Sequence, residues 1–282
     1  MLAAIALLWG LNWPMMKLAL KEVGVWQFRA MCVLAGLFWM GSYLLVKRMS
    51  FSIPSAHYGR LFVCAMGNVL GWNMLAAAGL SRLPSGRASL LAYSMPLWTV
   101  LLSWLILKEK LPASRWFAIP LGMSGIGLLL FDEIELLKNA PLGAGLMLAS
   151  GFVWAFGIVF TKGFPIEIPT QTLVFWQGIV GGLPIVIGAL YFGGAWRPAS
   201  PGSWMGLLFN LTIVFGFCHF AWNEIVRMLP GSVSGVTSLS VPVIGVLSGM
   251  WMLGETPRTL DWTALAMLCA AVAIVLYVKP KK

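Results

Sequence analysis

Residues 94–109 read SMPLWTVLLSWLILKE, and residues 240–255 read SVPVIGVLSGMWMLGE, so a similar stretch recurs 146 positions later. The two copies share the serine and proline near their start and the leucine and glutamate near their end. In the wider segments 82–131 and 228–277, 11 of 50 aligned positions are identical without a gap. Proline and glutamate interrupt or cap helices rather than fill them, so their matched positions indicate an internal repeat.

The composition places the whole chain in a membrane. Of its 282 residues, 60% are hydrophobic and only 10% are charged, whereas soluble domains have about 25% charged residues. This excludes a disordered chain, a disulfide-rich secreted scaffold and a soluble enzyme. The net charge of +10 comes from basic residues scattered singly between apolar runs. Such scattering favours a role in membrane orientation over a nucleic-acid partner.

The apolar runs are long enough for membrane-spanning helices, which need about 20 residues each. Short connectors separate them, and no pattern of alternating β-barrel strands is present, so the expected fold is an all-α integral membrane bundle. We interpret the first run as a retained helix rather than a cleaved signal peptide. The ten predicted spans are 2–20, 25–46, 58–80, 86–107, 113–131, 141–161, 170–193, 202–224, 231–253 and 261–278.

The repeat divides these ten helices into two units of five, residues 1–138 and 139–282. Near the N-termini of the units the offset is 145, which pairs Trp9 with Trp154 and Lys17 with Lys162. Because five is odd, the second unit must be inverted in the membrane relative to the first. Inverted repeats are frequent in secondary transporters, which bind substrate near the midplane where the repeats meet. The sequence therefore predicts two inverted five-helix repeats around a central cavity.

Several motifs resemble a known family. They are the opening Trp9-Gly10-Leu11-Asn12, Pro96 followed by Leu107-Lys108-Glu109 and Trp116, and the second-half copies of the latter. Over essentially its whole length the chain is similar to the drug/metabolite transporter superfamily, to its EamA-type exporters, and among these to bacterial aromatic amino acid exporters. The resemblance implies export of amino acids or similar small metabolites across a bacterial inner membrane by alternating access.

The orientation follows from counting basic residues on each side of the predicted spans. Eleven Lys and Arg residues fall on the side of the N-terminus and eight on the other side. The side richer in positive charge is usually cytoplasmic. We therefore expect a multi-pass protein with both termini in the cytoplasm.

Polar and aromatic side chains on one face of the first helix are candidates for cavity lining. Trp9, Asn12, Trp13 and Met16 follow helical spacing. The matching face of helix 141–161 carries Trp154. An indole from each repeat could form an apolar wall of a substrate cavity. The alternative is a tryptophan at the lipid interface, which the mid-span positions of Trp9 and Trp154 disfavour.

Helix 202–224 has the most polar face, which includes His219 and Asn223. The offset of 146 aligns His219 with Asn73 in the first repeat. An intramembrane histidine is commonly an interhelical hydrogen-bond donor, but it can also contact substrate or respond to protons. Both interpretations of His219 stay open.

Helices 86–107 and 231–253 carry small residues and one proline each. Small residues indicate close helix packing. Pro96 and Pro242 each remove a helical hydrogen bond, so the pair could serve as hinges for alternating access. Tyr93 and Ser238 lie on the small-residue faces as candidate substrate contacts. Trp98 is a weaker candidate because it lies about 140° away around an ideal helix.

The remaining charged and thiol side chains have structural explanations. Glu109 and Glu255 each precede a helix, where a carboxylate stabilises the N-terminus. Arg29 lies near the start of helix 25–46 and is expected to extend to the membrane interface. The four cysteines lie in apolar spans without a CxxC motif and are expected to be buried free thiols.

The chain has no P-loop, HExxH motif or His/Cys cluster, so we expect no metal, cofactor or enzymatic activity. The middle parts of the spans lack a Lys/Arg pair that would offset the desolvation of a phosphorylated solute. This favours a neutral or zwitterionic, partly apolar cargo such as aromatic amino acids. The expected partners are this solute and the lipid bilayer, for a monomer or homodimer. A broad-specificity drug exporter is the main alternative. An intramembrane enzyme built on His219 with Ser238 or Ser240, or a channel, is less favoured.

Overall fold

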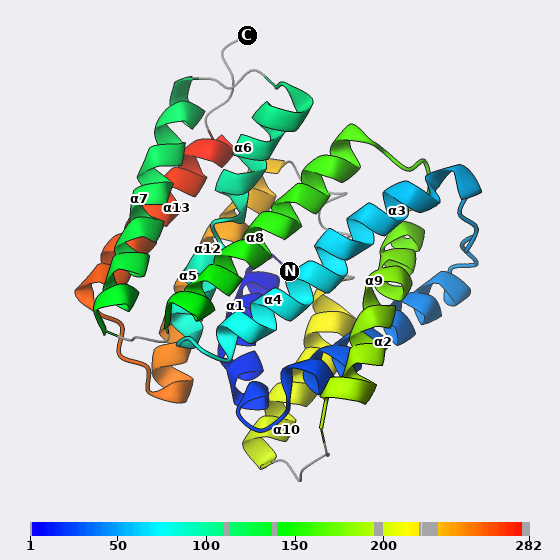
Figure 1. Ribbon diagram of the computed structural model, residues 1–282, viewed down its shortest axis with the longest axis horizontal. Helices are drawn as coiled ribbons and strands as arrows, with labels where there is room; N and C mark the ends of the chain where they lie inside the picture. The colour runs from blue at the N-terminus through cyan, green and yellow to red at the C-terminus, as the bar shows by residue number, and fades with distance from the viewer. Residues whose placement is uncertain are drawn as a thin grey trace.

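The computed structural model describes residues 2–109, 113–136, 140–194, 200–219, 221 and 231–277. In these ranges all regular secondary structure is helical, and no strand occurs (Figure 1). The described part of the chain contains seven helical segments that are long and apolar enough to cross a membrane, and shorter apolar stretches at Trp116–Leu129, Ser240–Leu253 and Thr259–Ile274. The protein is therefore an all-α, multi-pass membrane protein, and the described residues of each predicted span are largely helical.

The helices follow the predicted runs to within a few residues. In the first half they are α1 Leu2–Leu20, α2 Val25–Val46, η1 Ser55–His57, α3 Tyr58–Ala65, η2 Met66–Gly71, α4 Trp72–Leu80, α5 Ser85–Ala92, α6 Met95–Leu107 and α7 Ala113–Leu136. In the second half they are α8 Ala140–Gly163, α9 Thr170–Phe192, α10 Pro201–Leu208, η3 Phe209–Cys218, α12 Gly231–Leu253 and α13 Thr259–Tyr277. The segments η2 and η3 are π-helical and lie within continuous spans.

The two halves interlock rather than sit apart. Helix α1 packs against α12 and against α10 with η3, while α8 packs against α5 with α6 and against α4 with η2. Helices α2 and α9 pack together on one flank, and α7 and α13 on the opposite flank (Figure 1). Each half thus supplies the main packing surface for the first helix of the other half.

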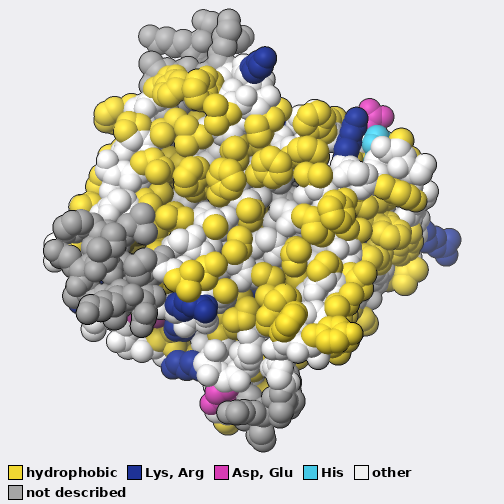
Figure 2. Space-filling view, in the orientation of Figure 1, with side chains coloured by type: hydrophobic (Ala, Val, Ile, Leu, Met, Phe, Trp, Pro, Cys, Tyr) yellow, Lys and Arg dark blue, Asp and Glu magenta, His cyan; other side chains and the backbone are white. Residues whose placement is uncertain are grey.

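The surface exposes many large apolar side chains, unlike the surface of a soluble protein. Large apolar side chains such as Phe38, Leu190 and Trp251 are 64%, 80% and 83% exposed. In the view of Figure 2, apolar side chains cover the middle of the face, and Lys and Arg lie towards its edges. Such a surface is stable against lipid, where basic side chains reach the headgroups.

One close helix contact depends on a glycine. A Cβ atom added at Gly206 of α10 would collide with the backbone carbonyl of Met15 in α1. Because a helix backbone cannot move aside as a side chain can, only glycine permits α10 to approach α1 so closely. This contact fixes the helix that carries η3 against the predicted cavity-lining helix.

The two predicted hinge prolines lie in different surroundings. Pro96 is at the start of α6, directly after a break between α5 and α6 at Tyr93 and Ser94. Pro242 lies inside α12, which continues without interruption. The four cysteines are free thiols, as predicted, and three are buried.

Candidate transport site

Trp9 and His219 meet between the two halves. Their rings lie edge to face with centroids 6.3 Å apart. Phe215, one turn before His219, stacks on the imidazole at a centroid distance of 5.0 Å and an angle of 12°. Aromatic pairs in these geometries attract beyond their burial of area. The contact joins α1 to the end of η3 with three aromatic rings.

The imidazole of His219 also forms a hydrogen bond within its own helix. Its Nδ1 donates a hydrogen bond of 2.7 Å to the carbonyl of Val214 inside η3. The aligned residue Asn73 does the same in the first half, since its Nδ2 donates at 2.8 Å to the carbonyl of Val69 inside η2. A π-turn disturbs the regular hydrogen-bond ladder, and such turns are frequent at functional sites. Each polar side chain therefore adds a hydrogen bond to a carbonyl of the adjacent π segment, beside the bond that this carbonyl accepts from a backbone N–H.

The equivalent contact, between the first helix of the second half and the third helix of the first half, is a pair of tryptophans. Trp154 of α8, which aligns with Trp9, lies 5.1 Å from Trp72 of α4 between ring centroids. The first helix of each half thus places an indole against the third helix of the other half. This arrangement brings the two predicted cavity tryptophans into corresponding contacts.

Two carboxamides near these rings have unsatisfied oxygens. The Oδ1 atoms of Asn12 and Asn68 are buried and accept no hydrogen bond from any residue that the structure describes. Asn68 packs where a Cβ atom at Gly157 would stand, and Gly157 aligns with Asn12. Buried unsatisfied polar atoms are uncommon and costly unless a ligand or water meets them. Two acceptors are therefore available beside the aromatic contacts.

The other predicted site residues divide into those inside and outside this region. Trp13 is buried in the main core, and Trp9 and Tyr93 pack against that core. Trp98 belongs to a separate cluster between α6 and α8, and its Nε1 donates to Ser94 Oγ at 3.2 Å. Asn223 lies outside the described residues, and the side chain of Ser238 is likewise not described.

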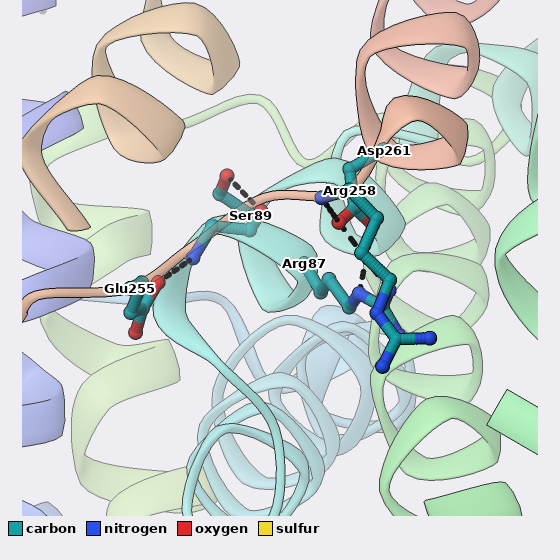
Figure 3. Close-up of polar contacts among 6 residues, drawn as sticks. Arg87, Ser89, Glu255, Arg258 and Asp261 are labelled. Atoms are coloured by element: carbon teal, nitrogen blue, oxygen red, sulfur yellow. Dashed lines mark hydrogen bonds and ion pairs between the residues drawn. The ribbon is translucent and has the colours of Figure 1, made fainter. Parts of the chain in front are cut away.

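A polar cluster ties α5 to the segment between α12 and α13. Glu255 accepts hydrogen bonds from the backbone N–H groups of Ser85 at 2.6 Å and Gly86 at 3.0 Å (Figure 3). Arg87 Nε lies 2.7 Å from Asp261 Oδ1. We call these five residues the inter-half latch. Glu255 was predicted to cap the helix that follows it, but it caps α5 of the other half instead.

The opposite end of the molecule is built differently. Glu109, the residue aligned with Glu255, forms an ion pair with Lys162 Nζ at 2.5 Å, and the lysine is 61% exposed. At the latch end, Lys17 Nζ donates to the carbonyls of Leu80 and Ser81, which closes the C-terminus of α4. A pocket of about 450 Å³ lies beside the latch. The latch end is thus tied between halves by part-buried contacts, whereas the ion pair of Glu109 with Lys162 is exposed.

Sequence reasoning also misplaced Arg29 and did not predict Asn68 and Trp72. Arg29 does not extend to the interface, because it is only 4% exposed and its Nη2 lies 3.4 Å from Met16 Sδ. Asn68 and Trp72 were not predicted as site residues, although both lie in apolar runs within the third span. The offset of 146 that aligns His219 with Asn73 could have identified both, because they lie within five residues of Asn73. Among the described residues, no group of three His, Cys, Asp or Glu side chains could hold a metal ion.

Comparison with known proteins identifies the family. Each half of the chain matches the model of the EamA-like transporter family, over residues 1–131 and 141–277. The chain belongs to the EamA-like transporter family. As an EamA-like protein it is a membrane transporter, which agrees with its apolar helices and with the resemblance in its motifs.

Several curated relatives are similar to this EamA-like chain over most of its length. A protein named as a probable amino-acid metabolite efflux pump of Salmonella typhimurium is 23% identical, covering 91% of this chain and 93% of the relative. A riboflavin transporter of Rhizobium johnstonii is 25% identical, covering 92% and 82%. A solved structure with a TM-score of 0.66 and 20% identity covers 97% of this chain and 95% of its own, and it shows the same fold.

Proposed function

We propose that this EamA-like protein exports aromatic and apolar amino acids and related small metabolites across a bacterial inner membrane. The observation that carries the proposal is the paired arrangement of Trp9 with His219 and Trp154 with Trp72. Indole and imidazole faces favour flat, partly apolar solutes. The efflux-pump name of the Salmonella relative agrees with such a cargo.

We propose further that residues 1–138 and 139–282 form inverted five-helix repeats that work by alternating access. The reciprocal packing of α1 and α8 on the opposite halves supports this arrangement. The corresponding positions of η2 and η3, and of Asn73 and His219, support it as well. Both termini would lie in the cytoplasm, which puts the inter-half latch on the periplasmic side.

The latch and Glu109 suggest how the two ends alternate. Glu255 holds the N-terminus of α5 in the present arrangement. By the offset of 146, the equivalent target of Glu109 is the N-terminus of α12. Opening the latch end would release Glu255, and closing the other end would bring Glu109 from Lys162 to α12. The hinges would be the helix break before Pro96 and the position of Pro242 inside α12.

A broader cargo range is the second candidate. The riboflavin transporter among the relatives shows that proteins similar to this chain are named for a larger heteroaromatic solute. Transport into proteoliposomes separates the candidates, with labelled phenylalanine, riboflavin and a lipophilic cation as parallel solutes. Saturable flux of phenylalanine alone supports amino acid export. Flux of the lipophilic cation without phenylalanine flux would overturn amino acid export and support the drug-exporter alternative.

A further inference from the structure

Arg29 is a buried cation that forms no ion pair with a carboxylate of the described residues. It lies one turn inside α2 and is 4% exposed. Its Nη2 contacts the thioether of Met16 at 3.4 Å, and its guanidinium lies 5.1 Å from the ring centroid of Phe28. A thioether is a weak acceptor. The Nε atom has no hydrogen-bond partner among the described residues, and none of their carboxylates forms an ion pair with Arg29.

The comparison with Arg87 makes this arrangement unusual. Arg87 has a side chain that is 10% exposed, and Asp261 meets it with both carboxylate oxygens, at 2.7 and 3.3 Å. An unpaired charge within a membrane protein is costly, and such residues commonly mark a substrate pathway. Within the described residues, a carboxylate therefore neutralises the largely buried Arg87, whereas none pairs with Arg29.

The position of Arg29 connects it to the candidate site. Met16, its contact, lies on the face of α1 that carries Trp9, Asn12 and Trp13. Asn12 is one helical turn from Met16, about 6 Å along the axis. Its Oδ1 atom is buried and accepts no hydrogen bond from a described residue. Asn12 thus lies one turn of α1 from Met16, the residue that contacts the Arg29 guanidinium.

We propose that Arg29 binds the α-carboxylate of the transported solute and that Asn12 accepts a hydrogen bond from its ammonium group. This inference rests on the proposed amino acid transport and names its recognition chemistry. A guanidinium can hold a carboxylate through two parallel hydrogen bonds, and a carboxamide oxygen suits an ammonium donor. The substrate class is then zwitterionic α-amino acids. The expected neutral or zwitterionic cargo is thereby narrowed to solutes whose carboxylate pairs with Arg29.

The test compares Arg29→Gln and Arg29→Lys with the control Arg60→Gln, whose arginine is exposed and lies outside the site. The solutes are L-phenylalanine, L-phenylalaninamide and phenethylamine. The measurements are transport into proteoliposomes and the melting temperature of the purified full chain with and without each solute. The wild type and the control should transport phenylalanine and be stabilised by it, and should respond weakly to the two solutes without a carboxylate.

Arg29→Gln should raise the KM for phenylalanine about tenfold to a hundredfold and abolish its preference over the amide. Arg29→Lys keeps the charge without the planar fork and should lie between. Without solute, Arg29→Gln should melt at the same temperature as the wild type or higher, because it removes an uncompensated charge. A purely structural arginine would instead lower that temperature and leave the preference for the carboxylate intact.

The outcomes separate this inference from the function on which it rests. Absence of phenylalanine transport and binding in the wild type would overturn both. Wild-type transport with an unchanged KM and unchanged carboxylate preference in Arg29→Gln would overturn only the assignment of Arg29. If Arg29→Gln does not fold, the test depends on Arg29→Lys. A wild-type KM and a wild-type preference for phenylalanine over its amide in Arg29→Lys would then overturn the assignment.

Discussion

Glu255, at the end of the second half's repeated stretch, accepts a hydrogen bond of 2.6 Å from the backbone N–H of Ser85, the first residue of α5 in the first half. A carboxylate at this position satisfies backbone donors that have no partner within the helix. The contact therefore stabilises α5 and joins the two halves at one end of the molecule.

Removal of the Glu255 carboxylate should weaken this end. Glu255→Ala leaves two N–H groups of α5 without their acceptor, so the free energy of unfolding should fall by about 1–2 kcal/mol. Denaturation of the purified protein in detergent measures the change. The matched control is Glu167→Ala, since Glu167 is exposed, and it should leave the stability unchanged.

The same substitution should also open the latch end. Ser89 is fully buried beside the latch, so a cysteine placed there with Ser89→Cys should react slowly with an impermeant maleimide. Adding Glu255→Ala should speed that labelling severalfold by shifting the population towards the open end. Equal labelling rates with and without Glu255 would show that the carboxylate does not hold this end closed.

His219 should be replaceable by asparagine but not by leucine. Asparagine at the aligned position, Asn73, already bonds to a carbonyl of its π segment. His219→Asn should therefore keep a side-chain bond to the Val214 carbonyl and retain a melting temperature close to the wild type. His219→Leu should remove the imidazole's bond, while the Val214 carbonyl keeps its bond from the backbone N–H of residue 219, and this should cost about 0.5–1.5 kcal/mol. Equal melting temperatures for the two variants would mean that the bond to Val214 contributes nothing.

The close approach of α10 to α1 leads to a further prediction. Gly206→Ala would place a methyl group against the Met15 carbonyl, so the helices must separate, at a cost of about 1–3 kcal/mol. Gly145→Ala in α8 is the control, because a Cβ atom there has no neighbour within 4 Å. Thermal denaturation should find the control as stable as the wild type or slightly more stable, since alanine favours helix. The reverse order would contradict the packing.

The sequence predicted the helices better than the site. Apolar runs between short, proline-rich connectors predicted the membrane helices within a few residues, because length and hydropathy alone determine which segments cross a bilayer. The repeat aligns Trp9 with Trp154, and both indoles contact the third helix of the opposite half. Periodicity shows which face a residue occupies on its own helix, so it could identify Trp9 as facing inward.

Contacts between helices were beyond sequence reasoning. Arg29 was expected at the interface because it lies near a helix end, but the packing of Met16 and Phe28 around it encloses the guanidinium. Glu255 was expected to cap the helix that follows it, whereas the fold brings it to α5. The π segments η2 and η3 also left no clear composition signal. These features depend on tertiary packing, which a single sequence does not specify.

Glu22 provides a pH-dependent contact outside the membrane. Its carboxylate accepts a hydrogen bond from the backbone N–H of Ser200 at 2.5 Å, and this bond lowers the pKa of Glu22 below its usual value of 4.5. A lowered pKa in the folded state means that the contact stabilises the protein above about pH 4.5 and loses its effect as the pH falls through the folded pKa.

The pH dependence of a Glu22 variant checks this sign. Glu22→Ala should melt slightly below the wild type at pH 6, and the difference should shrink as the pH is lowered towards 3. The measurement is the melting temperature of both proteins in detergent across that range. A difference that grows on acidification would show that the carboxylate is not stabilised in the folded state.

The central claim is that an EamA-like transporter with paired aromatic contacts moves amino acids by alternating access. Its most direct test is counterflow in proteoliposomes that hold purified protein and unlabelled phenylalanine inside, with trace labelled phenylalanine outside. A carrier that reorients with its cargo should accumulate label transiently above equilibrium, with saturation at high solute and strong reduction in Trp9→Ala. Label that only equilibrates, at a rate independent of the internal phenylalanine, or that does not enter at all, would contradict the account.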